Sequence, residues 1–207
     1  MTTLDLRANI PNDYFTAWEL NALLSDYSNR AAKISSLLKK REIIQIRRGF
    51  YTFAAPLRRE MLSAGALANQ IYSPSYVSED YALSYYGMIP ETSAVVTSVA
   101  MGRSRRFTTE FGIFSYRYCR SRAYSIGVTA VGEGQNRFLI ATPEKALFDK
   151  LVSDRRFDGS DPESYLLDDL RLDEDSLRHL NRKRLRELEP FMAGRLKSVC
   201  DYLEALR

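Results

Sequence analysis

The chain has 207 residues, of which 45 % are hydrophobic and 27 % charged, with a formal net charge of +4. This length fits one large domain or two small ones, and the 12 % of aromatic residues can form a core, which excludes a mainly disordered chain. Two cysteines and one histidine are too few for a zinc site or a disulfide framework. No apolar run reaches the ~18 residues of a membrane span, and the first residues carry no signal pattern, so we expect a cytoplasmic protein without a membrane partner.

Basic residues gather in two blocks of the sequence. Residues 26–60 contain nine Lys or Arg against three Asp or Glu, and residues 61–99 contain no Lys or Arg. The second block has six arginines opposed only by Glu110: Arg103, Arg105, Arg106, Arg117, Arg120 and Arg122. Two separated basic blocks suggest a polyanionic partner, although either block alone is equally consistent with a solvated surface.

The first predicted helices lie near the N-terminus. Residues 4–10 are interpreted as a supporting helix that Pro11 closes. Thr16 and Glu19 have the spacing of a capping box, so a helix is predicted to start there and to end near Asp26.

A further helix is predicted over about residues 29–41, with Ser28 as its N-cap. Its apolar side is Ala31, Ile34, Leu37 and Leu38. Its polar and basic stripe is Asn29, Lys33, Ser36 and Lys40, with Arg30 alongside. Such side chains donate hydrogen bonds to phosphates or base edges. A short helix, a tight turn and a helix with a polar basic face are typical of a helix-turn-helix.

A β-hairpin is predicted directly after this helix. Residues 42–53 form two short runs of β-branched or aromatic residues on either side of Arg47-Arg48-Gly49, where the glycine permits positive φ. In this position the hairpin would be a wing whose arginines reach the phosphate backbone or the minor groove. We therefore predict a winged helix-turn-helix domain over residues 1–58. The alternative is a small helical domain with a surface hairpin.

Residues 59–207 are predicted to form an α+β domain with a small, mainly antiparallel sheet and a helical tail from about residue 164. Helices are expected over residues 61–72, 78–87 and 142–151, and Ser73-Pro74-Ser75 is interpreted as a break. The predicted strands are Ala94–Ala100, Phe111–Tyr118, Tyr124–Val131 and Phe138–Ala141. The basic stretch of Arg103, Arg105 and Arg106 is a further candidate for contacts with a nucleic-acid backbone.

Tyrosines and carboxylates are the other candidates for functional groups. A tyrosine-rich patch is predicted to be mainly core, with base stacking or a protein-interaction hot spot as alternatives: Tyr72, Tyr76, Tyr81, Tyr85 and Tyr86. Glu144 and Asp149 are interpreted as parts of a helix rather than an acid–base pair. Because no phosphate-binding loop and no metal cluster is found, we expect no cofactor, no metal and no enzymatic activity.

The order of these segments resembles the AbiEi family of antitoxins from type IV toxin–antitoxin and phage abortive-infection systems. The matching stretches are Phe15–Leu24, Ala31–Leu38 leading into Ile46-Arg47-Arg48-Gly49-Phe50-Tyr51, Tyr76–Met88 and Ile140–Leu151. Together they span residues 14–153, whereas the tail over residues 172–207 does not align.

The resemblance implies a DNA-binding autorepressor that recognises inverted repeats in its own promoter and counteracts a nucleotidyltransferase-type toxin. By position, it assigns DNA contacts to Asn29, Arg30, Lys33, Arg47 and Arg48. Three alternatives stay open at this point: an antitoxin that acts through protein contacts, a ligand-sensing repressor, and an enzyme that modifies the toxin.

Overall fold

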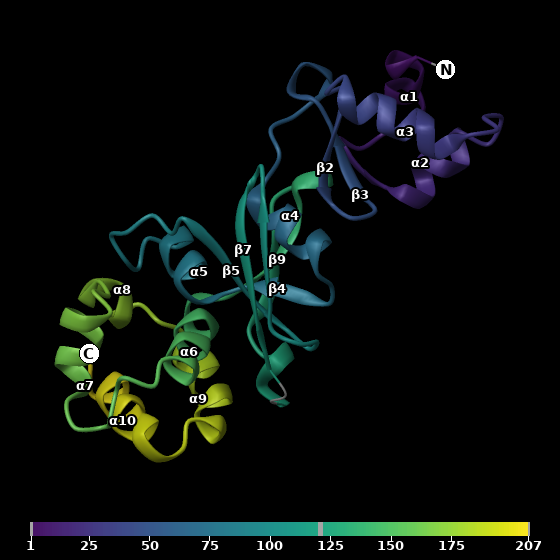
Figure 1. Ribbon diagram of the computed structural model, residues 1–207. Coiled ribbons are helices and arrows are strands. Elements are labelled where there is room, and N and C mark those ends of the chain that lie inside the picture. The colour runs from purple at the N-terminus through teal and green to yellow at the C-terminus, as the bar shows by residue number, and fades with distance from the viewer. Residues whose placement is uncertain (1, 120–121, 207) are drawn as a thin grey trace.

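The computed structural model describes residues 2–119 and 122–206 (Figure 1). The fold is α+β, with one three-stranded and one six-stranded sheet in the described chain. Figure 1 shows an elongated molecule, with the first sheet and its helices at one end, the larger sheet in the middle and the C-terminal helices at the other end.

The first unit has alternating helices and strands: α1 (Thr3–Asn9), β1 (Tyr14–Thr16), α2 (Ala17–Leu23), α3 (Arg30–Lys39), β2 (Ile43–Arg47) and β3 (Phe50–Phe53). Its sheet has the order β1-β3-β2, with both pairs antiparallel. The predicted capping box at α2 is confirmed, because Thr16 and Glu19 exchange backbone and side-chain hydrogen bonds. The helix predicted over residues 4–10 and the hairpin after α3 are also present.

The predicted start of α3 is wrong by one residue. Asn29, rather than Ser28, is the N-cap, and its side-chain oxygen accepts a hydrogen bond of 3.0 Å from the backbone N–H of Ala32. The buried face is set by the spacing of the apolar residues and not by the cap, and Ile34, Leu37 and Leu38 lie on it as predicted. Leu37 is buried, whereas Ala31, predicted on the apolar side, is exposed.

The larger sheet has the order β6-β7-β5-β4-β9-β8. It is mixed, since β4 runs parallel to β9 and β5 parallel to β7, while the other three pairs are antiparallel. The elements are α4 (Ala64–Ile71), β4 (Ser75–Val77), α5 (Glu79–Tyr85), β5 (Val95–Ala100), β6 (Arg105–Thr109), β7 (Gly112–Tyr118), β8 (Val128–Val131), β9 (Phe138–Ala141) and α6 (Pro143–Ser153).

Three predictions for this unit need correction. Ser75, the last residue of the segment interpreted as a break, begins strand β4, and Arg105 and Arg106 of the basic stretch begin strand β6. The strand predicted over residues 124–131 is shorter, because Arg122–Ser125 form a 3₁₀ turn. The sequence pattern did not predict β4 and β6. Each of them is stabilised by pairing with its neighbour in the sheet, β5 and β7 respectively.

The C-terminal tail is helical, as predicted: α7 (Pro162–Ser164), a π turn (Tyr165–Asp169), α8 (Glu174–Arg178), α9 (Arg182–Leu188) and α10 (Lys197–Ala205). Val199 and Leu203 are buried on one side of α10, so this helix is amphipathic. His179 is exposed, and its ring lies beside the backbone carbonyl of Asp175.

The two units are joined by a buried carboxylate. Asp13 is fully buried and accepts hydrogen bonds from the backbone N–H groups of Arg59 and Glu60, both at 3.0 Å, and from the side-chain amide of Gln135 at 2.7 Å. The guanidinium of Arg7 lies 3.2 Å from the same carboxylate. Asp13 therefore ties the first unit to the linker and to the turn before β9.

A second buried charge cluster lies in the core of the larger unit. Lys145 and Asp149 are both buried one helical turn apart on α6, and the ammonium lies 3.1 Å from the carboxylate. Asp149 also accepts hydrogen bonds from the hydroxyls of Tyr76 at 2.9 Å and Ser78 at 2.8 Å. Ser78, predicted to cap α5, therefore uses its hydroxyl to bond α6.

The tyrosine-rich patch does not form one exposed surface. Tyr76 is buried in this cluster, and Tyr72, Tyr81 and Tyr86 are partly buried against the hydrophobic core. Tyr85 alone of the five is exposed. The prediction that the patch is mainly core is confirmed.

Candidate nucleic-acid interface

Helix α3 belongs to the first unit, at the end of the molecule away from the C-terminal helices (Figure 1). Leu37 anchors it, and Ile34 and Leu38 pack partly buried against the same core. Its exposed residues are Arg30, Ala31, Ala32, Ser35 and Lys39. Ala31, Ala32, Ser35 and Lys39 lie on one side of the helix, whereas Arg30 lies in its first turn about 100° or more away from them, and its guanidinium donates a hydrogen bond to the carbonyl of Ser25.

The predicted contact residues of α3 are only partly on this face. Arg30 and Lys40 are exposed, but Lys33 and Ser36 are half-buried. The ammonium of Lys33 lies 5.5 Å from the ring centre of Tyr27, and the side-chain oxygen of Asn29 is used as the helix cap. The predicted contact stripe did not include the exposed Ser35 and Lys39, because it was chosen from polar residues at spacings of three and four rather than from the side opposite the buried residues.

The hairpin tip carries the other predicted cations. Arg47 and Arg48 are exposed, and neither makes an ion pair within the described chain. Gly49 has φ +78°, which closes the turn between β2 and β3. Its carbonyl accepts a hydrogen bond of 2.8 Å from the N–H of Ala17, so the tip lies against the first turn of α2.

Trp18 follows in that first turn of α2 and is 78 % exposed. It is the single tryptophan of the chain. In the sequence analysis Trp18 served only as part of a predicted helix, because its spacing along that helix does not distinguish an exposed residue from a core residue. An exposed indole beside two unpaired arginines is a combination found at binding surfaces.

Arg105 and Arg106 both lie exposed on β6, an edge strand of the larger sheet. Arg105 is opposite Tyr116 on β7 and Arg106 is opposite Ser115, so the two arginines point to opposite faces. Burial raises the pKa of Tyr116, and the positive charge of Arg47 counteracts part of that rise. Arg105 therefore lies on the same face of the sheet as Tyr116, and Arg106 lies on the opposite face.

Contacts between the units fix this arrangement. Arg41, just after α3, forms an ion pair of 2.8 Å with Glu110 at the β6–β7 turn. The guanidinium of Arg58 lies 5.1 Å from the ring centre of Phe111 in the same turn. The β6–β7 hairpin is thus held against the first unit at its tip.

The rest of the second basic block differs in its surroundings. Arg103 is exposed in the turn before β6. Arg117 is half-buried and bonds Glu79 at 2.5 Å, so it is occupied inside the core. Burial raises the pKa of Glu79, and the nearby guanidinium of Arg117 acts against this rise. Arg120 lies outside the described residues.

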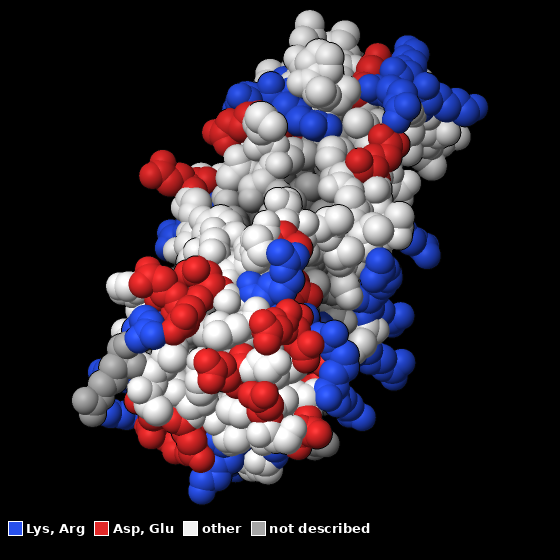
Figure 2. Space-filling model, turned by 90° about the vertical axis from the view of Figure 1, so that its left-hand side faces the viewer, with Lys and Arg blue, Asp and Glu red and all other residues white. Residues whose placement is uncertain are grey.

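Figure 2 shows how charge is distributed on one face. Lys and Arg flank the end formed by the first unit and continue down one edge, whereas Asp and Glu gather in the lower half, around the C-terminal helices. In the described part of the chain, His, Cys, Asp and Glu do not gather in groups of three or more that could hold a metal ion. A helix suited to crossing the bilayer is not found among the described residues.

Comparison with known proteins adds no identification. No family model matches the chain. A search of curated proteins gives no significant match either.

Proposed function

We propose that this protein is a DNA-binding autorepressor with an N-terminal winged helix-turn-helix and that it acts as the antitoxin of an AbiE-like type IV system. The observation that carries the DNA-binding part is the exposed cationic face of α3 followed at once by a hairpin with two unpaired arginines at its tip. Duplex DNA is the partner, and no reaction is catalysed.

The order of elements supports a winged helix. Three helices and three strands alternate as α1, β1, α2, α3, β2 and β3, and the sheet pairs β1 with β3 and β3 with β2. In a helix-turn-helix the second helix of the pair enters the major groove, which here is α3. Its Ala31 and Ser35 would allow the helix to lie close to the base edges, with Lys39 on the same side near the phosphates.

The arginines outside α3 supply backbone contacts in this proposal. Arg47, Arg48 and Arg105 are exposed, and their charges would attract phosphates without reading sequence. The exposed indole of Trp18 would pack against the sugar–phosphate backbone beside the hairpin tip.

The antitoxin part rests on the resemblance in segment order over residues 14–153. It is tested by co-expressing the chain with the neighbouring reading frame, where a nucleotidyltransferase-type toxin is expected. Rescue of growth supports the proposal. A toxic neighbour that the chain does not neutralise contradicts the antitoxin part while leaving DNA binding in place.

Replacing Arg47 and Arg48 together by alanine is expected to weaken binding to the duplex from its own upstream region. For every phosphate that the variant no longer neutralises, the slope of log affinity against log salt falls by ~0.9. Fluorescence anisotropy of a labelled duplex over a series of salt concentrations measures both quantities. Trp18 emission, recorded in the same titration, reports binding at the hairpin corner, since it is the only tryptophan.

The strand β6 offers a matched control. Arg105→Ala is expected to reduce affinity and slope, whereas Arg106→Ala removes the same charge from the opposite face and should change both much less. Equal effects of the two variants would mean that only net charge matters. Unchanged affinity and slope in the double variant would show that the hairpin does not bind phosphate.

A further inference from the structure

The small sheet of the first unit is covered on both of its faces. Its central strand, β3, is buried at all four positions, although a strand with one face in water alternates between buried and exposed residues. Phe15, Tyr51 and Phe53 point to one face and belong to the hydrophobic core that the helices of this unit complete. A different part of the chain therefore covers the other face.

The larger unit covers this second face. Ile46 and Phe50 are each 4 % exposed, and both belong to the hydrophobic core of the larger unit rather than to that of the first. Tyr14 packs partly buried against the same core, and its ring lies 5.6 Å from the ring of Phe50 in an edge-to-face contact. The hairpin of β2 and β3 is thus a part of the junction between the units.

Hydrogen bonds hold the same face against the turn between β8 and β9. The hydroxyl of Tyr14 donates to the backbone carbonyl of Gln135 at 2.5 Å. The backbone N–H of Asp13 donates to the side-chain oxygen of Gln135 at 2.6 Å. Because hydrogen bonds depend on direction as well as distance, two of them on one residue oppose sliding of the sheet over the larger unit.

The exposed hairpin tip lies directly between two of these buried residues. Residues 47–49 separate Ile46 from Phe50, so the backbone on both sides of the tip is anchored in the core. A backbone hydrogen bond to the first turn of α2 holds the tip on a third side. Binding of a phosphate by Arg47 and Arg48 would therefore order only their side chains, which lowers the entropic cost of the contact.

We propose that Phe50 and Tyr14 are positioning residues of the hairpin, through which the larger unit holds Arg47 and Arg48 in the geometry that binds DNA phosphates. Phe50 is buried, so its replacement changes DNA binding only through its neighbours. This role rests on the proposed DNA binding. It means that the first unit does not bind as an independent module, because its sheet needs the larger unit as a cover.

Phe50→Leu removes the ring contact with Tyr14 and keeps an apolar side chain in the core. We expect the duplex from the upstream region to bind this variant about three- to tenfold more weakly, since the tip must then be ordered on binding. The slope of log affinity against log salt should fall toward that of the Arg47→Ala, Arg48→Ala variant. Replacing both arginines should cost about threefold less affinity in the Phe50→Leu chain, which fluorescence anisotropy of the labelled duplex measures.

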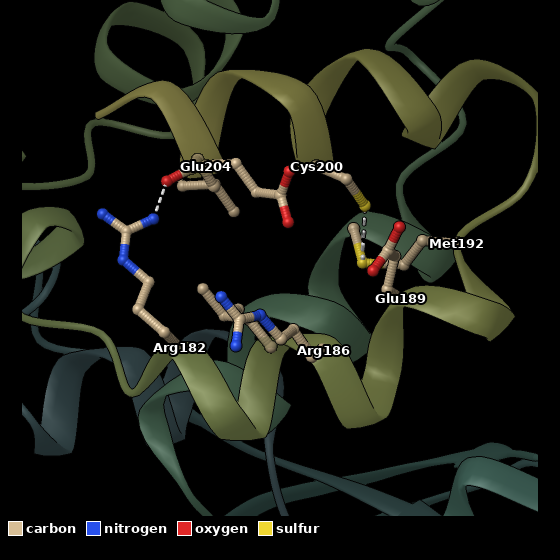
Figure 3. A pocket seen from close by; sticks show the side chains of 8 residues that line it. Arg182, Arg186, Glu189, Met192, Cys200 and Glu204 are labelled. Carbon is tan, nitrogen blue, oxygen red and sulfur yellow. Dashed lines mark hydrogen bonds between the residues drawn. The ribbon is translucent and has the colours of Figure 1, made fainter. Parts of the chain in front are cut away.

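The C-terminal helices form a region at the other end of the molecule from the first unit (Figure 1). Between α9 and α10 lies a cavity of about 360 Å³, and Figure 3 shows Arg182, Arg186, Glu189 and Glu204 around it. Two cations balance two carboxylates there, so this lining selects neither an anion nor a cation. Since this region lies away from the junction, it is the place for a control.

Phe157→Leu is the matched control. Phe157 is also buried, and its ring stacks on that of Tyr165 at 4.4 Å, so the same substitution removes a comparable ring contact. We expect this variant to lose stability in urea denaturation and to keep the affinity and salt slope of the unchanged chain. Tyr14→Phe loses only the hydrogen bond to Gln135 and should weaken DNA binding by a smaller factor than Phe50→Leu.

Hydrogen exchange tests the anchoring without DNA. The amides of β2 and β3 are expected to exchange about tenfold faster in Phe50→Leu than in Phe157→Leu, since only the first change frees the hairpin from the larger unit. Equal exchange in the two variants overturns the proposal, and so do costs in affinity that simply add when Phe50→Leu is combined with the arginine replacements. A chain whose hairpin loosens as expected but that does not bind the duplex contradicts the proposed function, and the anchoring by the larger unit then stands without a role in DNA binding.

Discussion

Replacing Asp149 by alanine is expected to lower the free energy of unfolding by about 3–5 kcal/mol, the usual cost of removing one partner from a buried ion pair. Lys145 would remain fully buried, and no carboxylate would pair with its ammonium. The hydroxyls of Tyr76 and Ser78 would lose the acceptor that both now share. Since whole domains are stable by only about 5–15 kcal/mol, this variant comes close to unfolding.

The size of this effect follows from the position of Asp149. The carboxylate joins α6 to β4 and to the residue before α5, and Arg117 on β7 lies 3.7 Å away. Next to it, Glu79 has φ +55°, a strained backbone conformation for a residue with a side chain. We infer that the ionic cluster helps to hold this start of α5 in place.

Urea denaturation with a constant m-value measures the loss. Asp175→Ala is the control, because that side chain is 80 % exposed and the change should cost less than about 0.5 kcal/mol. Combining Lys145→Met with Asp149→Leu should recover part of the stability, since no unpaired charge is then left in the core. Equal, small losses for Asp149→Ala and Asp175→Ala would contradict a stabilising role of the cluster.

Replacing Asp13 by alanine is expected to cost about 3 kcal/mol and to loosen the junction between the two units. The change leaves the backbone N–H groups of Arg59 and Glu60 without their acceptor and the guanidinium of Arg7 without its carboxylate. Limited proteolysis should cut the linker after β3 faster than in the unchanged chain. Circular dichroism follows the unfolding of the whole chain.

The same residue predicts a pH dependence. Burial by itself would raise the pKa of Asp13, but the N–H groups of Arg59 and Glu60, the amide of Gln135 and the charge of Arg7 outweigh burial and lower it. Ionised Asp13 therefore contributes stability that is complete above the unfolded pKa of ~3.9 and is lost as the pH falls through the lower folded pKa.

Asp13→Asn turns this dependence into a measurement. The difference in unfolding free energy between the unchanged chain and the variant should stay constant from about pH 7 to pH 5 and shrink below about pH 4. A difference that is the same at every pH would show that the charge of Asp13 is not what the junction needs.

Local signals in the sequence identified most of the first unit. The Thr16–Glu19 capping box, the spacing of the apolar residues and Gly49 in the turn each act within about four residues, so they place α2, α3 and the hairpin without knowledge of the rest. The same reasoning placed the cap of α3 one residue too early, put the exposed Ala31 on the apolar side and left the exposed Lys39 out of the contact stripe.

Long-range packing decided which of these residues are available to a partner. Arg105 and Arg106 are adjacent and chemically identical, yet the register of β6 on β7 directs them to opposite faces. Lys145 and Asp149 have the spacing of an ordinary surface pair on a helix, but α6 packs so that both are enclosed. Caps and turns depend on neighbours in the chain, whereas burial depends on strands and helices far away in the sequence, and so only the tertiary structure could separate the exposed cations from the buried ones.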